Sequence, residues 1–233
     1  PGDRQRGFAL GLWLPRAWYR RDRWLSLLSP FSWVFQQLAG RNRRRSESHQ
    51  ARYQSPVPII IVGNITAGGT GKTPVVIALA NWLTQEGYKP GVISRGFGGS
   101  AKQLIRVTAA SDPALVGDEP LMIEASTGVP TICCRDRVQA AVQLNETTDC
   151  DVIISDDGLQ HYRLPRNFEI VVIDGLRGFG NGRLLPAGPL REKPSRLQEV
   201  DCILVNGPDQ FRVAPTSALS IAVEVDYLFD AKT

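Results

Sequence analysis

The residues with the clearest chemistry form a glycine-rich turn that ends in Gly-Lys-Thr. The turn spans residues 63–73 and follows an apolar, β-branched run at 59–62. Glycines let backbone N–H groups approach phosphate oxygens, and the start of a following helix adds partial positive charge. In such a loop Lys72 reaches the β- and γ-phosphates of a nucleotide, and the Thr73 hydroxyl ligates Mg²⁺. We therefore predict a P-loop that binds a nucleotide through Thr66, Ala67, Gly68, Gly69, Thr70, Gly71, Lys72 and Thr73.

This loop differs at one position from the usual motif. The pattern G-x-x-x-x-G-K-[ST] expects glycine at position 66, where this chain has Thr66. Gly68 and Gly69 supply a glycine pair instead. The alternative is a glycine-rich turn that only caps an ordinary helix. The strand pattern before the turn and the helical pattern at 75–83 both favour the nucleotide-binding loop.

Two adjacent acids, Asp156 and Asp157, follow the apolar run 151–155. A buried strand that delivers a carboxylate beside a P-loop can hold Mg²⁺ directly or through water. A turn residue or a helix cap is the alternative for the second acid. We predict ATP and Mg²⁺ as the cofactors, with Thr73, Asp156 and Asp157 at the metal.

Asp118 and Glu119 stand where a short helix is expected to begin. A kinase needs a carboxylate that orients or deprotonates the attacking hydroxyl, in line with the γ-phosphate. Asp118 is our candidate for that base. The competing interpretation is that Asp118 only caps the helix.

A long glycine- and proline-rich segment at 178–192 ends in Arg191 and Glu192. Long loops in compact domains are usually functional or mobile. We expect Arg191 to stabilise the charge of a transferring phosphate, and Glu192 to support the metal. A surface ion pair of little energetic value is the alternative.

His161, one of only two histidines, comes just after the acid pair. From that place an imidazole can contact a phosphate or a polar group of a substrate. The alternative is a loop histidine that is hydrogen-bonded to backbone.

Apolar runs alternate with helical patterns from residue 56 onward. Strands are expected at 59–62, 91–94, 103–107, 129–133, 151–155, 168–173, 202–205 and 219–225, and helices at 73–86, 118–125 and 137–144. This alternation predicts an α/β fold of the P-loop NTPase type, a mostly parallel sheet with helices on both faces. Ligands bind at the carboxyl ends of such strands. Gly63, Arg95, Asp156, Asp174 and Asn206 are expected at that edge. Asn206 stands where a residue that recognises the nucleotide base often lies.

Residues 1–53 differ in kind from residues 54–233, which we expect to form the core domain. The first segment has a net charge of +8, all of its basic residues being arginines, whereas the remainder has −4. Its tryptophans, leucines and phenylalanines alternate with arginine, and no uncharged run reaches the roughly 18–20 residues that span a bilayer. Ser29 and Pro30 are suited to cap and start a helix. The pattern predicts an amphipathic helix at a membrane interface; a helix packed on its own domain is the alternative.

Composition restricts the remaining classes. The four cysteines form no C-x-x-C pair, so a disulfide framework or a zinc site is not expected. Reduced, buried thiols fit the cytosol. No nucleic-acid-binding motif accompanies the arginines, and we expect no nucleic-acid partner and a monomeric chain.

Five sequence strings together carry a resemblance to a known family. They lie at 63–74, 94–98, 117–120, 156–161 and 180–192. Of these, Asp-Asp-Gly-Leu-Gln-His and Leu-Leu-Pro-Ala-Gly-Pro-Leu-Arg-Glu are far more specific than the P-loop. In these strings, over roughly residues 10–228, the chain resembles the tetraacyldisaccharide 4′-kinases, which act in the lipid A biosynthesis of Gram-negative bacteria.

The resemblance implies a reaction: ATP phosphorylates the 4′-hydroxyl of tetraacyldisaccharide 1-phosphate to give lipid IVA. It implies a protein at the cytoplasmic face of the inner membrane, held there through residues 1–53. The catalytic residues implied are Lys72, Asp118, Asp157 and Arg191, with Asp118 as the base. The substrate-binding residues implied are Asn64, Arg95, Glu119, Gln160 and His161.

One departure accompanies the resemblance. Family members usually continue into a second lobe, which supplies the far side of the cleft and a histidine that pairs with the catalytic aspartate. Neither His49 nor His161 occupies that place. We expect weak or absent turnover if these 233 residues are the whole protein. Two competing classes stay open: a membrane-associated nucleotide-binding protein without kinase activity, and a soluble small-molecule kinase.

Overall fold

The core of the protein is an eight-stranded sheet with the strand order β3-β4-β2-β5-β1-β6-β7-β8. The computed structural model describes residues 15–47, 53–96, 99 and 103–223. The antiparallel strand β3 pairs with β4, and the other pairs are parallel. The strands are β1 (Ile59–Gly63), β2 (Pro90–Ser94), β3 (Ile105–Arg106), β4 (Thr131–Cys133), β5 (Val152–Asp156), β6 (Phe168–Asp174), β7 (Cys202–Asn206) and β8 (Leu219–Ile221).

The predicted α/β fold is confirmed, and every expected strand exists. The central strands β1 and β5 are buried along almost their whole length, as their continuous apolar sequences require. Because β1 lies between β5 and β6, the acid pair and Asp174 flank the glycine loop on opposite sides. The predicted last strand ends sooner, at Ile221, and its expected residues 224–225 lie outside the described residues.

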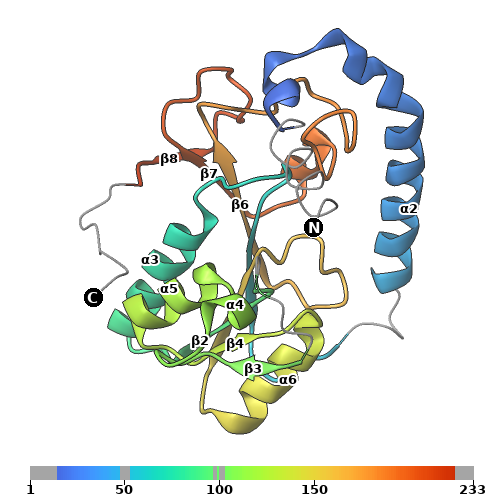
Figure 1. The fold of residues 1–233 in the computed structure, drawn as a ribbon. Coiled ribbons are helices and arrows are strands. Elements are labelled where there is room, and N and C mark those ends of the chain that lie inside the picture. Colours follow the sequence, from blue (N-terminus) through green and yellow to red (C-terminus); the bar gives the residue numbers. More distant parts are fainter. Residues whose placement is uncertain (1–14, 48–52, 97–98, 100–102, 224–233) are drawn as a thin grey trace.

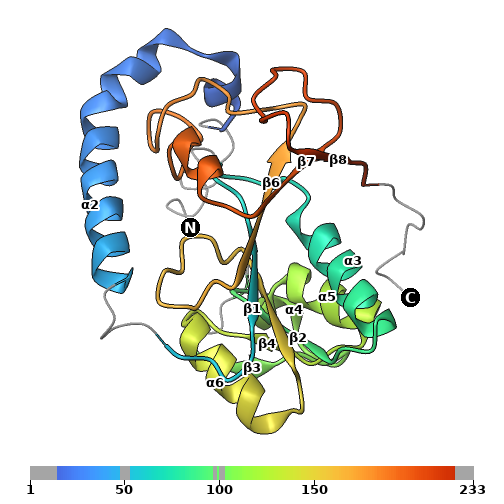
Figure 2. The ribbon, with the colours of Figure 1, turned by 180° about the vertical axis from the view of Figure 1, so that it is seen from behind.

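Helices cover both faces of the sheet (Figures 1 and 2). On one face α3 (Lys72–Gln85) and α5 (Asp118–Thr127) bury Val76, Leu83 and Ile123 against the strands. On the other, α6 (Arg137–Thr147) packs Leu144 so closely on β2 that a side chain at Gly91 would meet it at 2.5 Å. Two short helices escaped prediction, α4 (Pro113–Val116) and the 3₁₀ helix η2 (Pro194–Gln198).

The N-terminal segment stands beside this core. Residues 15–20 are helical, and the 3₁₀ helix η1 (Arg23–Leu28) leads directly into α2 (Ser29–Glu47). Ser29 itself has helical backbone angles, φ −57° and ψ −38°, so its predicted role as the cap is wrong. In Figures 1 and 2 α2 runs along one side of the molecule as a long arm, apart from the sheet.

Candidate active site

The glycine loop joins β1 to α3 at the carboxyl edge of the sheet. Gly68 and Gly71 adopt φ of 108° and 90°, conformations that residues with a Cβ rarely adopt. Gly71 is the N-cap of α3 and offers no side-chain oxygen to the first N–H groups. Those groups and the positive end of the helix dipole are therefore available to an anion. The Thr70 hydroxyl is buried without a partner among the described residues. An unpartnered hydroxyl at this place fits a group that binds a ligand.

Hydrogen bonds from three directions fix the shape of this loop. Asn64 donates its side-chain amide to the Gly68 carbonyl at 3.2 Å, and Asn206 donates to the Thr70 carbonyl at 3.3 Å. On the third side, the Ala67 backbone N–H donates to the Pro189 carbonyl at 2.7 Å. Asn64 is fully buried, so its contacts favour support of the loop, and its predicted substrate contact stays a prediction.

The first acid of the pair, Asp156, is only 1% exposed. Ser94 donates its hydroxyl to Asp156 Oδ2 at 3.0 Å, whereas Oδ1 is buried without a partner among the described residues. Burial raises the pKa of this carboxyl, since the charged form is poorly solvated. An unpartnered carboxylate oxygen in such a place fits a cation such as Mg²⁺. The Arg137 guanidinium, also buried, holds the Asp156 backbone carbonyl at 3.0 Å.

The second acid, Asp157, forms ion pairs with both Lys72 and Arg191. Lys72 Nζ lies 3.5 Å from Asp157 Oδ1, and Arg191 donates to both carboxylate oxygens at 3.1 Å. Burial alone would raise the pKa of Asp157, but Lys72 and Arg191 together lower it below its usual value. Asp157 adopts φ of 49°, an unusual backbone conformation that clusters at functional sites. Three of the four predicted catalytic residues therefore meet at one point.

Both carboxylate oxygens of Glu192 have partners among the described residues. Gln160 donates to Glu192 Oε1 at 2.7 Å, and the Tyr162 hydroxyl donates to Oε2 at 2.7 Å. Arg196 Nε lies 3.5 Å from the same Oε2. These contacts favour a role in positioning the neighbouring Arg191, and the predicted metal contact of Glu192 stays a prediction. Sequence reasoning missed Tyr162 and Arg196, since both lie just outside the sequence strings that carried the resemblance.

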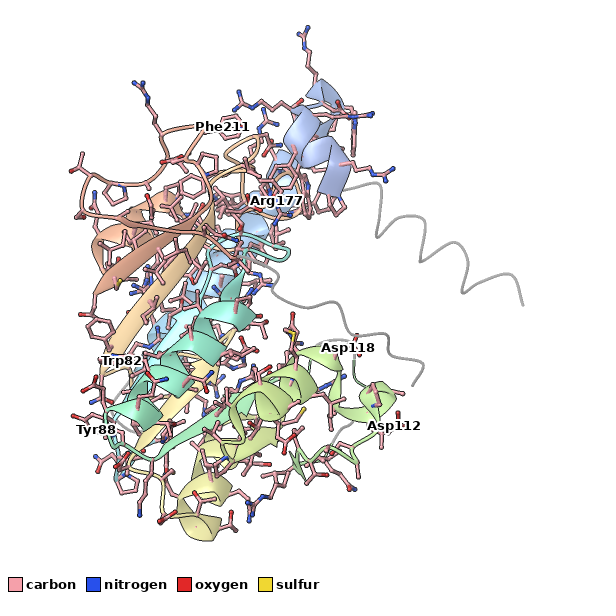
Figure 3. All side chains as sticks on the ribbon, turned by 90° about the vertical axis from the view of Figure 1, so that its left-hand side faces the viewer. Trp82, Tyr88, Asp112, Asp118, Arg177 and Phe211 are labelled. Atoms are coloured by element: carbon pink, nitrogen blue, oxygen red, sulfur yellow. The ribbon has the colours of Figure 1, made fainter. Side chains whose placement is uncertain are left out.

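Asp118 begins α5 but does not cap it. Gly117 is the N-cap, with φ of 84°, and Asp118 is the first helical residue with an exposed side chain. The capping alternative is therefore wrong, and the role of Asp118 as base stays a prediction; Figure 3 labels Asp118 at the start of α5. Glu119 beside it is half-buried, and burial and the nearby Asp156 raise its pKa.

Two predicted substrate-binding residues lie farther along the edge. Arg95 is exposed and directly follows β2. His161 lines a cavity of about 360 Å³ together with Arg135, Arg163 and residues at the end of α2. Burial, helped by the positive charge of Arg137, lowers the pKa of His161 to about 4, so the imidazole is neutral at pH 7. A neutral histidine can donate or accept a hydrogen bond from a polar ligand.

The N-terminal segment contacts the loops of the site. Trp18 donates its indole N–H to the Pro186 carbonyl at 3.0 Å, and Ser32 bridges the Leu184 carbonyl and the Ala187 N–H at 2.8 and 3.1 Å. The opposite face of this segment exposes large apolar side chains, Leu27, Phe31, Trp33, Val34 and Leu38. Within the described ranges no helix combines the length and apolar character needed to cross a membrane. The same residues hold no cluster of three His, Cys, Asp or Glu arranged for a metal.

Comparison with known proteins agrees with this geometry. Residues 24–227 match the family model of tetraacyldisaccharide-1-P 4′-kinase. The chain belongs to the tetraacyldisaccharide 4′-kinase family. A 4′-kinase of this name from Methylobacillus flagellatus is 50% identical over 205 residues, which cover 86% of this chain and 61% of the relative. The one from Chromobacterium violaceum is 52% identical over 195 residues, which cover 82% and 57%.

A solved family structure shares the fold. The crystal structure of the Aquifex aeolicus 4′-kinase in complex with ATP superposes with a TM-score of 0.71 at 27% identity. The match covers 85% of this chain and 64% of that one. The chain thus spans roughly three fifths of the length of the 4′-kinases it matches.

Proposed function

We propose that this chain carries the phosphate-transfer site of an ATP-dependent kinase that phosphorylates the 4′-hydroxyl of tetraacyldisaccharide 1-phosphate. The observation that supports it most is the meeting of Lys72, Asp157 and Arg191 beside an uncapped glycine loop. Membership of the 4′-kinase family supplies the acceptor, and the ATP complex of the Aquifex aeolicus relative supports the donor.

The residues of the chain divide the work of the transfer. The loop N–H groups and the start of α3 hold the phosphates, while Lys72 and Arg191 balance the negative charge on the phosphoryl group that moves. Asp118 accepts the proton of the acceptor hydroxyl as its oxygen attacks the γ-phosphorus. The bond from that phosphorus to the β–γ bridging oxygen breaks, and ADP leaves. Asp157 keeps Lys72 and Arg191 oriented through its ion pairs.

A magnesium ion fits the free side of Asp156. The buried, unpartnered Asp156 Oδ1 and the Thr73 hydroxyl are the groups that would hold it, directly or through water. Bound there, the ion would neutralise charge on the nucleotide phosphates.

The lipid acceptor calls for a membrane surface, and α2 suits that purpose. Its exposed apolar side chains and its arginines, including Arg41, Arg44 and Arg45, are those of an interfacial helix. We propose peripheral attachment at the cytoplasmic face of the inner membrane, as a monomer. Liposome flotation tests the attachment: the double variant Trp33→Ser/Leu38→Ser should bind anionic vesicles less, whereas Trp82→Ser, at another exposed position, on α3, should bind as before. Equal flotation of all three proteins would contradict it.

Transfer of labelled phosphate from ATP to tetraacyldisaccharide 1-phosphate in detergent micelles with Mg²⁺ tests the reaction. Even at the low rate expected of these 233 residues, product should form only with the acceptor and should disappear in Asp118→Ala. Product at equal rates in both proteins would remove Asp118 from the proposal. ATP hydrolysis that ignores the acceptor would indicate a nucleotide-binding protein of another kind.

A further inference from the structure

Arg177 lies on the other side of the glycine loop from the acid pair. It follows β6, the strand that flanks β1 opposite β5. Its terminal nitrogen NH1 lies 3.5 Å from the place where a Cβ at Gly68 would stand. Figure 3 labels Arg177 close to the loop that leads into α3. The guanidinium therefore lies beside Gly68, in the part of the loop that we expect to bind phosphate.

The side chain is held in this place from two sides. Its Nε donates to the Asp174 carboxylate, whose other oxygen accepts the Leu176 and Arg177 backbone N–H groups, both at 3.0 Å. The Tyr19 ring from the N-terminal segment lies under the guanidinium, with Cζ 5.6 Å from the ring centroid. A guanidinium fixed through Nε and one face loses less entropy when it binds a ligand.

The terminal nitrogens are the remaining donors of the Arg177 guanidinium. Among the described residues, the two terminal nitrogens of Arg177 have no hydrogen-bond partner, and the side chain is 38% exposed. Arg191, by contrast, donates hydrogen bonds from NH1 to Asp157 and Gln160. Arg177 thus presents a paired set of N–H groups toward solvent at the edge of a loop built for anions, and such a fork matches phosphate oxygens.

We propose that Arg177 is a further phosphate-binding residue of the glycine loop, acting across the loop from Lys72 and Arg191. The inference rests on the proposed function, since it requires a nucleoside triphosphate in this loop. Asp174 and Tyr19 then act as positioning residues that aim the guanidinium. The P-loop motif did not predict Arg177, because Arg177 comes close to Gly68 only through the strand order of the sheet.

Binding measured by calorimetry tests this without the acceptor. In Arg177→Gln we expect ATP and inorganic tripolyphosphate to bind roughly tenfold more weakly, and binding to depend less on salt concentration, because one charge contact is lost. Arg177→Lys should recover part of the loss. Arg106→Gln, an exposed arginine on the far edge strand β3, should bind as the original chain does. The thermal midpoint of each variant serves as the control for folding.

The outcomes separate the two proposals. Unchanged affinity in Arg177→Gln would overturn the role of Arg177 and leave the kinase proposal standing. A similar loss of affinity in Arg177→Gln with an unchanged salt dependence would also overturn it. A residue with only a structural role would give that result. Weakened ATP binding as expected, in a chain that transfers no phosphate to the acceptor, would support Arg177 and count against the kinase proposal. A chain that binds no ATP would overturn both.

Discussion

Two clusters of buried acids and bases lie in this molecule, and they are built differently. Around Glu169, Arg196 donates to both carboxylate oxygens at 2.6 and 2.7 Å, and Arg166 adds a third contact at 2.6 Å. Around the acid pair, Asp156 keeps one oxygen without a partner, and Asp157 holds an unusual backbone conformation.

The difference separates a structural cluster from a functional one. A buried carboxylate whose oxygens are all matched gains enough from its contacts to offset much of its lost hydration. A buried carboxylate with a free oxygen bears a cost that the folded chain does not recover. Such a cost is reasonable where a ligand supplies the missing partner, which is the role we propose at Asp156. Four predictions test this contrast.

Removal of the charge at the structural cluster should have the largest effect on stability. In Glu169→Gln the buried Arg196 and the partly buried Arg166 lose their counter-charge, and we expect the free energy of unfolding to fall by about 3–5 kcal/mol. In Asp156→Asn stability should stay the same or rise, because the neutral side chain avoids the burial cost that raises the pKa of Asp156. Urea denaturation of both variants measures this. Equal losses in the two would remove the distinction between the clusters.

Removal of a cation at the functional cluster should instead impair the chemistry. We expect Lys72→Met to lower the rate of phosphate transfer by about 10²–10³-fold, the usual effect of removing one charge-stabilising donor. Single-turnover measurements at saturating ATP report the chemical step. Lys89→Met is the matched control, since Lys89 pairs with Asp149 on the exposed surface. A rate in Lys72→Met close to that of the control would contradict the proposed site.

Acid should weaken the fold through His161, which neighbours the functional cluster. Its pKa is about 4 in the folded chain and about 6.5 when unfolded, so between these values only the unfolded state binds the proton. Stability is therefore complete above about pH 6.5 and is lost as the pH falls toward 4. We expect a loss of about 2 kcal/mol between pH 7 and pH 5. His161→Gln should lack this component, and the difference between the two denaturation series isolates it; parallel series would contradict it.

The sequence was informative about elements and less so about contacts. Strands such as β5 were predictable because an apolar run buried on both faces has few other solutions. The helix α4 was missed, although Asp112 caps it and Pro113 occupies its first turn, because four residues carry too little periodicity. Asp112 and Pro113 are a helix start signal, and this signal was the only one in the sequence that could have predicted α4.

The candidate site shows the same division. The P-loop, the acid pair and Arg191 were predictable because each motif carries its chemistry in consecutive residues. Tyr162, Arg137 and Arg177 were not, since their partners come from distant segments that only the strand order brings together. The metal contact predicted for Glu192 stays a prediction, since its carboxylate oxygens contact Gln160, Tyr162 and Arg196 among the described residues.

The smallest expected effect concerns Tyr162, which links the two clusters. Its hydroxyl donates to Glu192 at 2.7 Å, and Arg196 contacts both Glu192 and Glu169. Tyr162→Phe removes one hydrogen bond to a charged acceptor and leaves the ring in place. We expect Glu192 to hold Arg191 less firmly, with kcat lowered about fivefold, equivalent to about 1 kcal/mol, and an unchanged KM for ATP.

Steady-state kinetics of Tyr162→Phe beside Tyr88→Phe, an exposed tyrosine outside the site, provide the measurement. If the variant loses stability but keeps its kcat, Tyr162 belongs to the structural cluster alone. If kcat falls while the unfolding free energy changes little, Glu192 transmits the effect to Arg191 through Gln160, which donates to Glu192 and accepts from Arg191. The cluster around Glu169, in which both carboxylate oxygens have partners, would then act as the fixed support against which the acid pair is aligned.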